Sequence, residues 1–279
     1  MDSSWDALLR PWISSRYFDV PCPPPFETDA MDCSLINAWW LCELSRLIYR
    51  QDPDETGTEA LVPTRSEILR NVGLREIATF SSGTNYGTIV ASQRNTSRPF
   101  SVLVFRGTSG FEGWLSNLKA IQTGWLGGGS VHSGFKMDFL GLWQKIEPFL
   151  LRNDFPLYVT GHSLGGALAV LAASIFSARA VYTFGAPKTG DSVFADSLKN
   201  ARIYRFENDH DIITTVPPSA IPFDFCHVGT PFCLKENIRA DSVPTNGRSL
   251  TDPPLFLSNH APVNYTMRLE NVLLQSQGF

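Results

Sequence analysis

Short apolar runs alternate with helical periods along the chain. The β-branched runs 101–107 and 157–161 each end at a glycine, which is typical of buried strands. Residues 180–185, which also end at a glycine, and residues 201–208 are the third and fourth predicted strands. Four further segments have apolar residues at helical spacing and are predicted helices. They are residues 35–49, before the first strand, and residues 135–151, 165–176 and 191–198, between the strands. This alternation predicts an α/β fold with a mostly parallel sheet and helices on both faces.

Residues 1–30 differ from the rest of the chain. They contain a cluster of prolines between Pro21 and Pro25, which predicts an N-terminal arm rather than a domain. Residues 31–279 contain no internal repeat and no linker, so we expect a single domain. A chain of 279 residues can bury a sizeable core without disulfides or metal ions.

The composition excludes several classes of protein. Apolar residues make up 43% of the chain and the formal net charge is only −4, which excludes a disordered protein. The slightly acidic balance provides no basic face for nucleic acid. The longest apolar stretch, residues 164–176, is too short for the roughly 30 Å of a bilayer core, so no transmembrane segment is expected.

The N-terminus and the cysteines favour a cytoplasmic chain. The opening MDSSWDALLRPW carries acids where a secretory signal has Lys or Arg, and it lacks an apolar segment. The five cysteines are an odd number without a framework spacing. Cys226 and Cys233 are close enough in sequence to form a disulfide, but reduced thiols are the expectation for a cytoplasmic protein.

The pattern G-x-S-x-G at 161–165 joins a predicted strand to a predicted helix. In this context the serine, Ser163, lies on a tight turn that exposes its Oγ as a nucleophile. The flanking Gly161 and Gly165 lack the Cβ atoms that would collide as the turn packs against neighbouring strands. The N–H group of Leu164, at the start of the helix, is placed to donate to an oxyanion.

Several further motifs occur in a fixed order around this turn. They are NAWWLCELSRLIY, VFRGT, VHSGF, TGHSLGGALA, FGAPKTGD, NDHDIITTVPP and FCHVG. In these motifs the chain resembles the class 3 (fungal-type) lipases of the α/β-hydrolase superfamily, over residues 35–265. The resemblance implies an α/β-hydrolase fold with a helical lid, and hydrolysis of carboxylic esters without a cofactor. The odd cysteine count departs from the secreted members of the family.

A catalytic serine needs a histidine base, which in α/β-hydrolases follows the acid in the chain. The histidines after Ser163 are His210, His227 and His260. His210 lies beside the candidate acids, and His227 follows a Pro-rich loop at a position that the family uses structurally. His260 lies in a late loop from which its side chain can reach back over the sheet. We therefore expect His260 to be the base.

Two aspartates follow the strand at 201–208, at the end where active sites of parallel sheets gather. Position alone leaves Asp209 and Asp211 open, since either could be the acid or cap the turn. The resemblance implies Asp211. Asp191 is expected to be an acid at a helix N-terminus, and His132 and His162 are expected to be structural.

The second oxyanion donor should come from the loop after the strand at 101–107. The resemblance places Thr108 there, with its N–H group and its hydroxyl facing the oxyanion. Capping of the following helix is an alternative role for Thr108, and both roles are compatible.

An apolar stripe with three- and four-residue steps follows Thr108 and predicts an amphipathic helix at 111–125. Its members are Phe111, Trp114, Leu115, Leu118, Ile121 and Trp125. Such a stripe is typical of a core-facing helix, but the family has its lid at this place. The resemblance therefore implies a lid with Phe111, Trp114, Leu115 and Leu118 against the substrate, which opens at a lipid–water interface. The glycines at 127–129 are expected to act as its hinge.

No metal or nucleotide cofactor is predicted. The chain lacks H-E-x-x-H, and Cys226, His227 and Cys233 provide too few ligands at an unconvincing spacing. It also lacks G-x-x-x-x-G-K-[ST] and a G-x-G-x-x-G after a strand.

The predicted function is a serine hydrolase for lipid esters, most readily a triacylglycerol lipase. A soluble carboxylesterase, a phospholipase A1-type enzyme and an acyltransferase share the same acyl-enzyme chemistry and remain alternatives. A non-catalytic lipid-binding scaffold would lack a member of the triad, and none is missing here.

Overall fold

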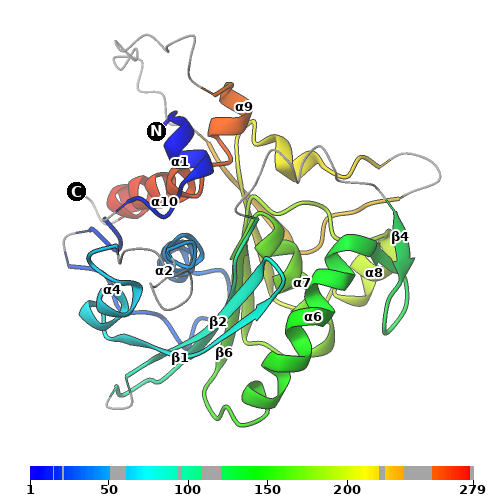
Figure 1. Ribbon diagram of the computed structural model, residues 1–279, viewed down its shortest axis with the longest axis horizontal. Coiled ribbons are helices and arrows are strands. Elements are labelled where there is room, and N and C mark those ends of the chain that lie inside the picture. Colours follow the sequence, from blue (N-terminus) through cyan, green and yellow to red (C-terminus); the bar gives the residue numbers. More distant parts are fainter. Residues whose placement is uncertain are drawn as a thin grey trace.

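A seven-stranded sheet forms the centre of the computed structural model, which describes residues 1–14, 16–20, 22–50, 61–93, 96–108, 121–219, 224–235 and 253–276. Its strands, in spatial order, are β1 (Leu74–Ser82), β2 (Asn85–Ser92), β3 (Ser101–Phe105), β6 (Leu157–His162), β7 (Ala180–Phe184), β8 (Ile203–Asn208) and β9 (Thr230–Leu234). The pairs β1–β2 and β2–β3 are antiparallel, and every pair from β3 to β9 is parallel. The predicted mostly parallel sheet is confirmed (Figure 1).

The four predicted strands are β3, β6, β7 and β8, all of which are largely buried. The apolar pattern does not predict β1, β2 or β9. Strand β1 keeps one face partly exposed and carries polar residues there, so it has no continuous apolar run. Strand β9 is short, exposed at its start and contains Pro231, which argues against a strand in sequence reasoning.

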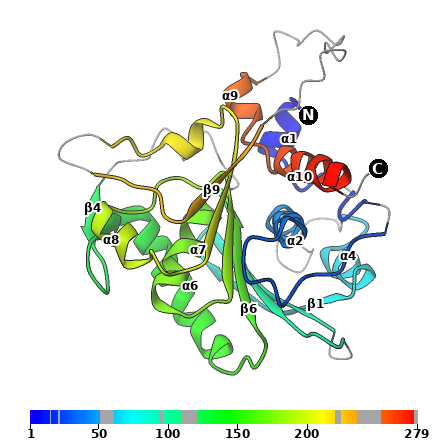
Figure 2. The same cartoon turned by 180° about the vertical axis from the view of Figure 1, so that it is seen from behind.

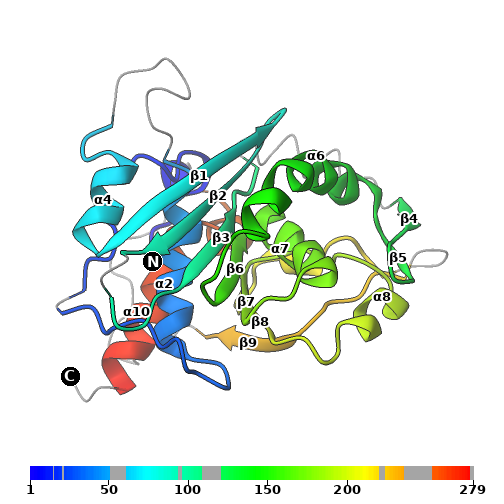
Figure 3. The ribbon, with the colours of Figure 1, turned by 90° about the horizontal axis from the view of Figure 1, so that it is seen from below.

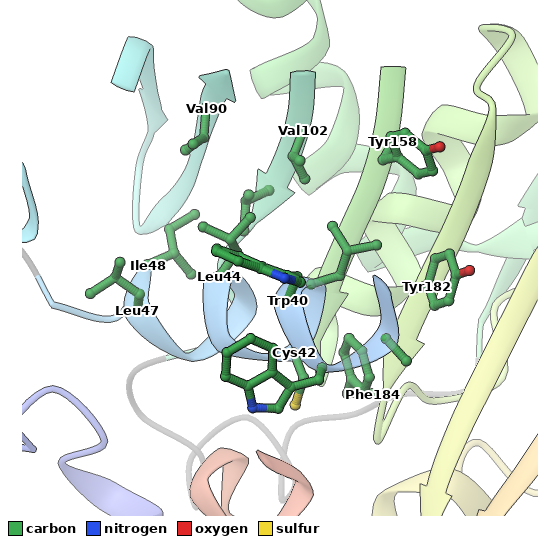
Figure 4. Close-up of a cluster of buried hydrophobic side chains, with 14 of the residues drawn as sticks. Trp40, Cys42, Leu44, Leu47, Ile48, Val90, Val102, Tyr158, Tyr182 and Phe184 are labelled. Atoms are coloured by element: carbon green, nitrogen blue, oxygen red, sulfur yellow. The ribbon is translucent and has the colours of Figure 1, made fainter. Parts of the chain in front are cut away.

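Helices cover both faces of the sheet, as predicted. One face carries α2 (Leu35–Leu47) and α10 (Pro262–Ser276), with α4 (Arg65–Asn71) beside them, and the other carries α6 (Ser133–Leu150), α7 (Leu164–Ile175) and α8 (Ser192–Ser197) (Figures 1 and 3). Each face buries its own cluster of apolar side chains. Figure 4 shows part of the first cluster, in which Trp40 and Leu44 of α2 lie opposite Val102 of β3. Of the helices that the structure describes, none is long and apolar enough to cross a membrane.

The predicted N-terminal arm lies along α2 and α10. Its helix α1 (Trp5–Leu9) lies next to α10 and to the short helix α9 (Leu255–Ser258) (Figure 2). The Phe18 ring is buried against Trp39 at a centroid distance of 5.9 Å, and the Phe18 N–H donates to Glu43 Oε1 at 3.0 Å. The arm therefore shields the outer side of α2 from solvent.

The prediction of a helix up to Trp125 is wrong at its C-terminal end. Residues Gln122–Gly124 form strand β4, which pairs with β5 (Ser130–His132). Trp125 is only 7% exposed; its ring lies against Phe139, and its Nε1 donates to Ser174 Oγ at 2.8 Å. The four-residue step from Ile121 to Trp125 matches a helical period, but it arises because this hairpin places Trp125 against α6.

The three glycines expected to act as a hinge lie in the turn of this hairpin. Gly127, Gly128 and Gly129 all have positive φ and form the turn between β4 and β5. The Gly128 N–H donates to the Trp125 carbonyl at 3.3 Å, and the Trp125 N–H donates to the Gly129 carbonyl at 3.0 Å. The predicted lid residues Phe111, Trp114, Leu115 and Leu118 lie outside the described residues.

Candidate active site

Ser163 lies on a strained turn between β6 and α7. Its backbone has φ 59° and ψ −130°, a conformation that residues other than glycine rarely adopt. The Ser163 N–H donates to the Phe184 carbonyl at 2.9 Å, and the Ser163 carbonyl accepts from the Gly166 N–H at 2.9 Å. The ends of β7 and α7 therefore hold the serine in this conformation, which is the arrangement that the sequence pattern predicted.

The two glycines of the pattern are required by their neighbours. A Cβ atom on Gly161 would lie 2.2 Å from the Gly165 carbonyl carbon, and a Cβ atom on Gly165 would lie 2.2 Å from the Phe105 carbonyl oxygen. The obstacles are backbone atoms, which cannot rotate away as a side chain can. The turn thus packs tightly between β3 and β6.

Asp211 and His260 form a buried pair close to this turn. Asp211 follows β8 at the start of a 3₁₀ turn (Ile212–Thr215), and His260 lies between α9 and α10. His260 Nδ1 lies 2.8 Å from Asp211 Oδ2 and 3.1 Å from Oδ1. Because a carboxylate only accepts, Nδ1 carries the proton and Nε2 of the neutral ring carries the lone pair. His260 is therefore in the tautomer that a general base needs.

Tyr265 of α10 is a further partner of Asp211 that the sequence analysis missed. Its hydroxyl donates to Asp211 Oδ2 at 2.6 Å and accepts from the Asn208 N–H at 3.0 Å. Burial, and then the Asp211 carboxylate, raise the pKa of Tyr265 well above its ordinary value. A lone tyrosine after the histidine carries no motif, so only the packing of α10 on the sheet reveals its role.

Gly185 provides the room for this cluster. Its φ is +58°, and a Cβ atom there would lie 2.8 Å from Asp211 Oδ2, 3.0 Å from the Tyr265 hydroxyl and 3.1 Å from His260 Nδ1. Gly185 directly follows Phe184, whose carbonyl binds the Ser163 N–H. The end of β7 thus adjoins both the serine turn and the Asp211–His260 pair.

The two candidate acids differ in burial. The Asp211 side chain is fully buried, whereas the Asp209 side chain is 47% exposed and its Oδ1 lies 3.7 Å from Nε2 of the exposed His210. Asp209 and His210 therefore face solvent. Asp191 accepts from the Phe194 N–H at 2.8 Å and caps α8, as expected of an acid at a helix N-terminus.

The loop with Thr108 runs beside the serine. A Cβ atom on Gly107 would lie 3.2 Å from Ser163 Cβ, which places this loop directly against the turn. Arg106 anchors the loop, because its Nη2 donates to the Thr84 carbonyl at 2.7 Å and its guanidinium lies 5.2 Å from the Tyr86 ring centroid. The Thr108 Oγ1 is buried and makes no hydrogen bond to the described part of the chain. Leu164 begins α7 and is also buried.

The residues considered for metal binding are not clustered. Within the described ranges, no group of three or more His, Cys, Asp or Glu side chains could hold a metal ion. Cys226 and Cys233 are free thiols, the first half-buried and the second exposed.

Comparisons with known proteins point to one family. Residues 102–220 match the family model described as lipase (class 3). The lipase of Rhizomucor miehei is 32% identical over 171 residues, which are 54% of this chain and 46% of that protein. The secreted mono- and diacylglycerol lipase 1 of Fusarium solani is 28% identical over 168 residues, 54% of this chain and 48% of its own. The chain thus spans about half the length of these relatives.

A solved structure has the same fold over a larger share of the chain. The lipase of Rhizopus microsporus var. chinensis superposes with a TM-score of 0.60 over 78% of this chain and 82% of its own, at 24% identity.

His227 supports the segment that carries Asp211. Its Nε2 donates to the Thr214 carbonyl at 2.6 Å, in the 3₁₀ turn that begins after Asp211. Burial, and then the positive charge of Arg205, lower the pKa of His227 to about 4. His227 is therefore neutral in the folded protein at pH 7, where its donor N–H holds the turn.

Because the folded protein disfavours a charged His227, we expect its contribution to stability to be lost as the pH falls from about 6.5 to 4. Unfolded chains bind the proton first in this range, so the free energy of unfolding decreases. At pH 4.5 this amounts to about 2 kcal/mol. Urea denaturation at pH 7 and pH 4.5 should show a smaller loss for His227→Gln than for the unchanged protein. Equal losses would contradict this assignment.

Proposed function

The chain belongs to the class 3 lipase family and has the α/β-hydrolase fold, and from this premise we propose that it hydrolyses carboxylic esters through an acyl-enzyme on Ser163. One observation carries the proposal: the strained Ser163 turn adjoins the buried Asp211–His260 pair across the end of β7. A strained serine and an oriented imidazole are the two parts that nucleophilic acyl transfer needs.

Ser163, His260 and Asp211 have the roles of nucleophile, general base and orienting acid. Ser163 Oγ attacks the ester carbonyl carbon while His260 Nε2 takes the hydroxyl proton, and the same nitrogen then returns this proton to the departing alkoxide. Water then attacks the acyl-enzyme carbonyl carbon while His260 Nε2 takes a proton from the water. The same nitrogen returns this proton to Ser163 Oγ as the carboxylic acid leaves. Asp211 keeps Nδ1 protonated and stabilises the imidazolium that forms in each step.

The oxyanion of the tetrahedral intermediate needs donors that are already in place. We assign them to the backbone N–H groups of Leu164 and Thr108, with the Thr108 hydroxyl as a third. Two observations support this assignment: Leu164 is the first residue of α7, and the Thr108 Oγ1 is buried beside the serine turn without a hydrogen bond in the described ranges.

For the substrate we propose acylglycerols, with triacylglycerol first and transient contact with a lipid–water interface. The names of the Rhizomucor and Fusarium relatives support this choice. So do two exposed apolar side chains shortly before His260 in the chain, Leu255 and Phe256 of α9, which are 38% and 45% exposed. The proposed lid comprises Phe111, Trp114, Leu115 and Leu118.

Substitution of the two aspartates tests the assignment of the acid. Asp211→Asn should lower kcat on a dissolved short-chain ester by about 10⁴-fold, because the amide favours the wrong imidazole tautomer. Asp209→Asn is the matched control and should change kcat by less than about threefold, since its side chain faces solvent. Ser163→Ala should abolish turnover while circular dichroism shows a folded protein. Equal losses in the two Asp variants would overturn the role of Asp211.

A series of triglycerides with rising chain length tests the substrate class. Initial rates are measured below and above the solubility limit of each ester, with Ser163→Ala in parallel. We expect the rate to rise sharply once droplets form, because the exposed apolar side chains of α9 and the proposed lid then have lipid to contact. Saturation on dissolved short esters without such a rise would show a soluble carboxylesterase instead.

A further inference from the structure

His162, next to the proposed nucleophile, makes two hydrogen bonds that none of the steps above uses. Its Nε2 lies 2.7 Å from the His260 carbonyl oxygen, and its Nδ1 lies 3.1 Å from the Tyr49 hydroxyl. The rings of His162 and His260 are close, with centroids 4.6 Å apart. His162 and Tyr49 are both buried. His162 thus connects the base to a residue that follows α2.

Donor and acceptor chemistry fixes the direction of these bonds. The His260 carbonyl can only accept, so Nε2 of His162 carries the proton. Burial, and then the neighbouring His260, hold the pKa of His162 well below its ordinary value, so the ring is neutral. A neutral ring has one N–H group, and Nδ1 must therefore accept from the Tyr49 hydroxyl.

Tyr49 also contacts the loop that carries Thr108. Its hydroxyl lies directly against the backbone of Gly107, and burial raises the pKa of Tyr49 so that it remains a donor. The approach is close, because a Cβ atom on Gly107 would lie 2.1 Å from the Tyr49 hydroxyl. Gly107 directly precedes Thr108, to which we assigned an oxyanion donor.

We propose that Tyr49 and His162 are positioning residues that set the separation between the oxyanion loop and the catalytic base. Gly107 packs against the Tyr49 hydroxyl, the Tyr49 O–H donates to His162 Nδ1, and the His162 Nε2–H donates to the His260 carbonyl. We call this set of contacts, from Gly107 through Tyr49 and His162 to His260, the relay. The inference rests on the proposed ester hydrolysis, because it assigns the relay a role in that reaction. Both residues are buried, and we assign them no contact with the reacting atoms.

The relay matters because its two ends come from separate segments. Residues 106–108 follow β3 and His260 follows α9, and His162 adjoins Ser163 between them. Without the Tyr49 hydroxyl, the His162 ring loses the bond that fixes its tautomer. A flipped tautomer would turn a lone pair toward the His260 carbonyl and displace the base. Displacement of a catalytic group by about 1 Å can cost up to about 10²-fold in rate.

Tyr49→Phe removes one hydroxyl and keeps the ring. We expect kcat on a dissolved short-chain ester to fall at least about tenfold, with KM changed less than about twofold. Tyr158→Phe is the matched control: Tyr158 lies on β6, is also buried, and donates its hydroxyl to the Thr28 carbonyl at 3.0 Å, away from the serine turn. It should keep kcat within about twofold while lowering the thermal midpoint as much as Tyr49→Phe does.

A pair of His162 variants separates positioning from packing. His162→Gln retains an N–H donor that can reach the His260 carbonyl, whereas His162→Leu has none. We expect the Gln variant to retain several-fold more kcat than the Leu variant. Equal kcat in the two His162 variants, or equal kcat in the Tyr49 and Tyr158 variants, would overturn the positioning role.

The ¹⁵N spectrum of labelled histidine tests the relay without turnover. The His162 ring should stay in the Nε2–H tautomer from pH 5 to 8, and its Nδ1 signal should move in Tyr49→Phe. Titration of His162 near pH 6.5, or the opposite tautomer, would contradict the relay even in a protein with no esterase activity. Absence of Ser163-dependent hydrolysis with the expected spectrum would instead refute the proposed function and leave the relay as a structural contact.

Discussion

A carboxylate that is fully buried must be paired, because taking its charge out of water costs several kcal/mol. Asp211 meets this requirement by accepting hydrogen bonds from the Ile213 N–H, the Tyr265 hydroxyl and His260 Nδ1. These three groups come from the 3₁₀ turn, α10 and the loop before it. One carboxylate therefore binds segments that lie far apart in the chain. The orientation of His260, and with it the rest of the proposed chemistry, depends on this pairing.

The parallel sheet explains why the parts meet where they do. Strands β3, β6, β7 and β8 run in the same direction, so their carboxyl ends share one edge of the sheet. The residues that follow these ends are Thr108, Ser163, Gly185 and Asp211. Ligand sites of open α/β sheets lie at such edges. Two further residues reach this edge from outside the sheet: His260, in the loop before α10, and Tyr265, in the first turn of α10.

The sequence predicts those features whose structure depends on neighbouring residues in the chain. The G-x-S-x-G turn and the four buried strands follow from their own residues, because a strained turn and a buried strand each need a particular composition. Tyr265 and Tyr49 could not be found this way, since their roles depend on contacts across 54 and 113 residues of chain. The spacing of Trp125 matches a helix, but a hairpin determines its burial, so the predicted helix extends too far.

Covalent labelling tests the central claim, that Ser163 is the nucleophile of a hydrolase, most directly. A fluorophosphonate reacts with an activated serine when Oγ displaces fluoride and forms a stable phosphonate ester, whatever the natural substrate. Intact mass should show one adduct per chain, and peptide mapping should place it on Ser163. Prior substitution of Asp211 by Asn should slow the labelling strongly. An adduct on another residue, or no adduct on the folded protein, would contradict the account.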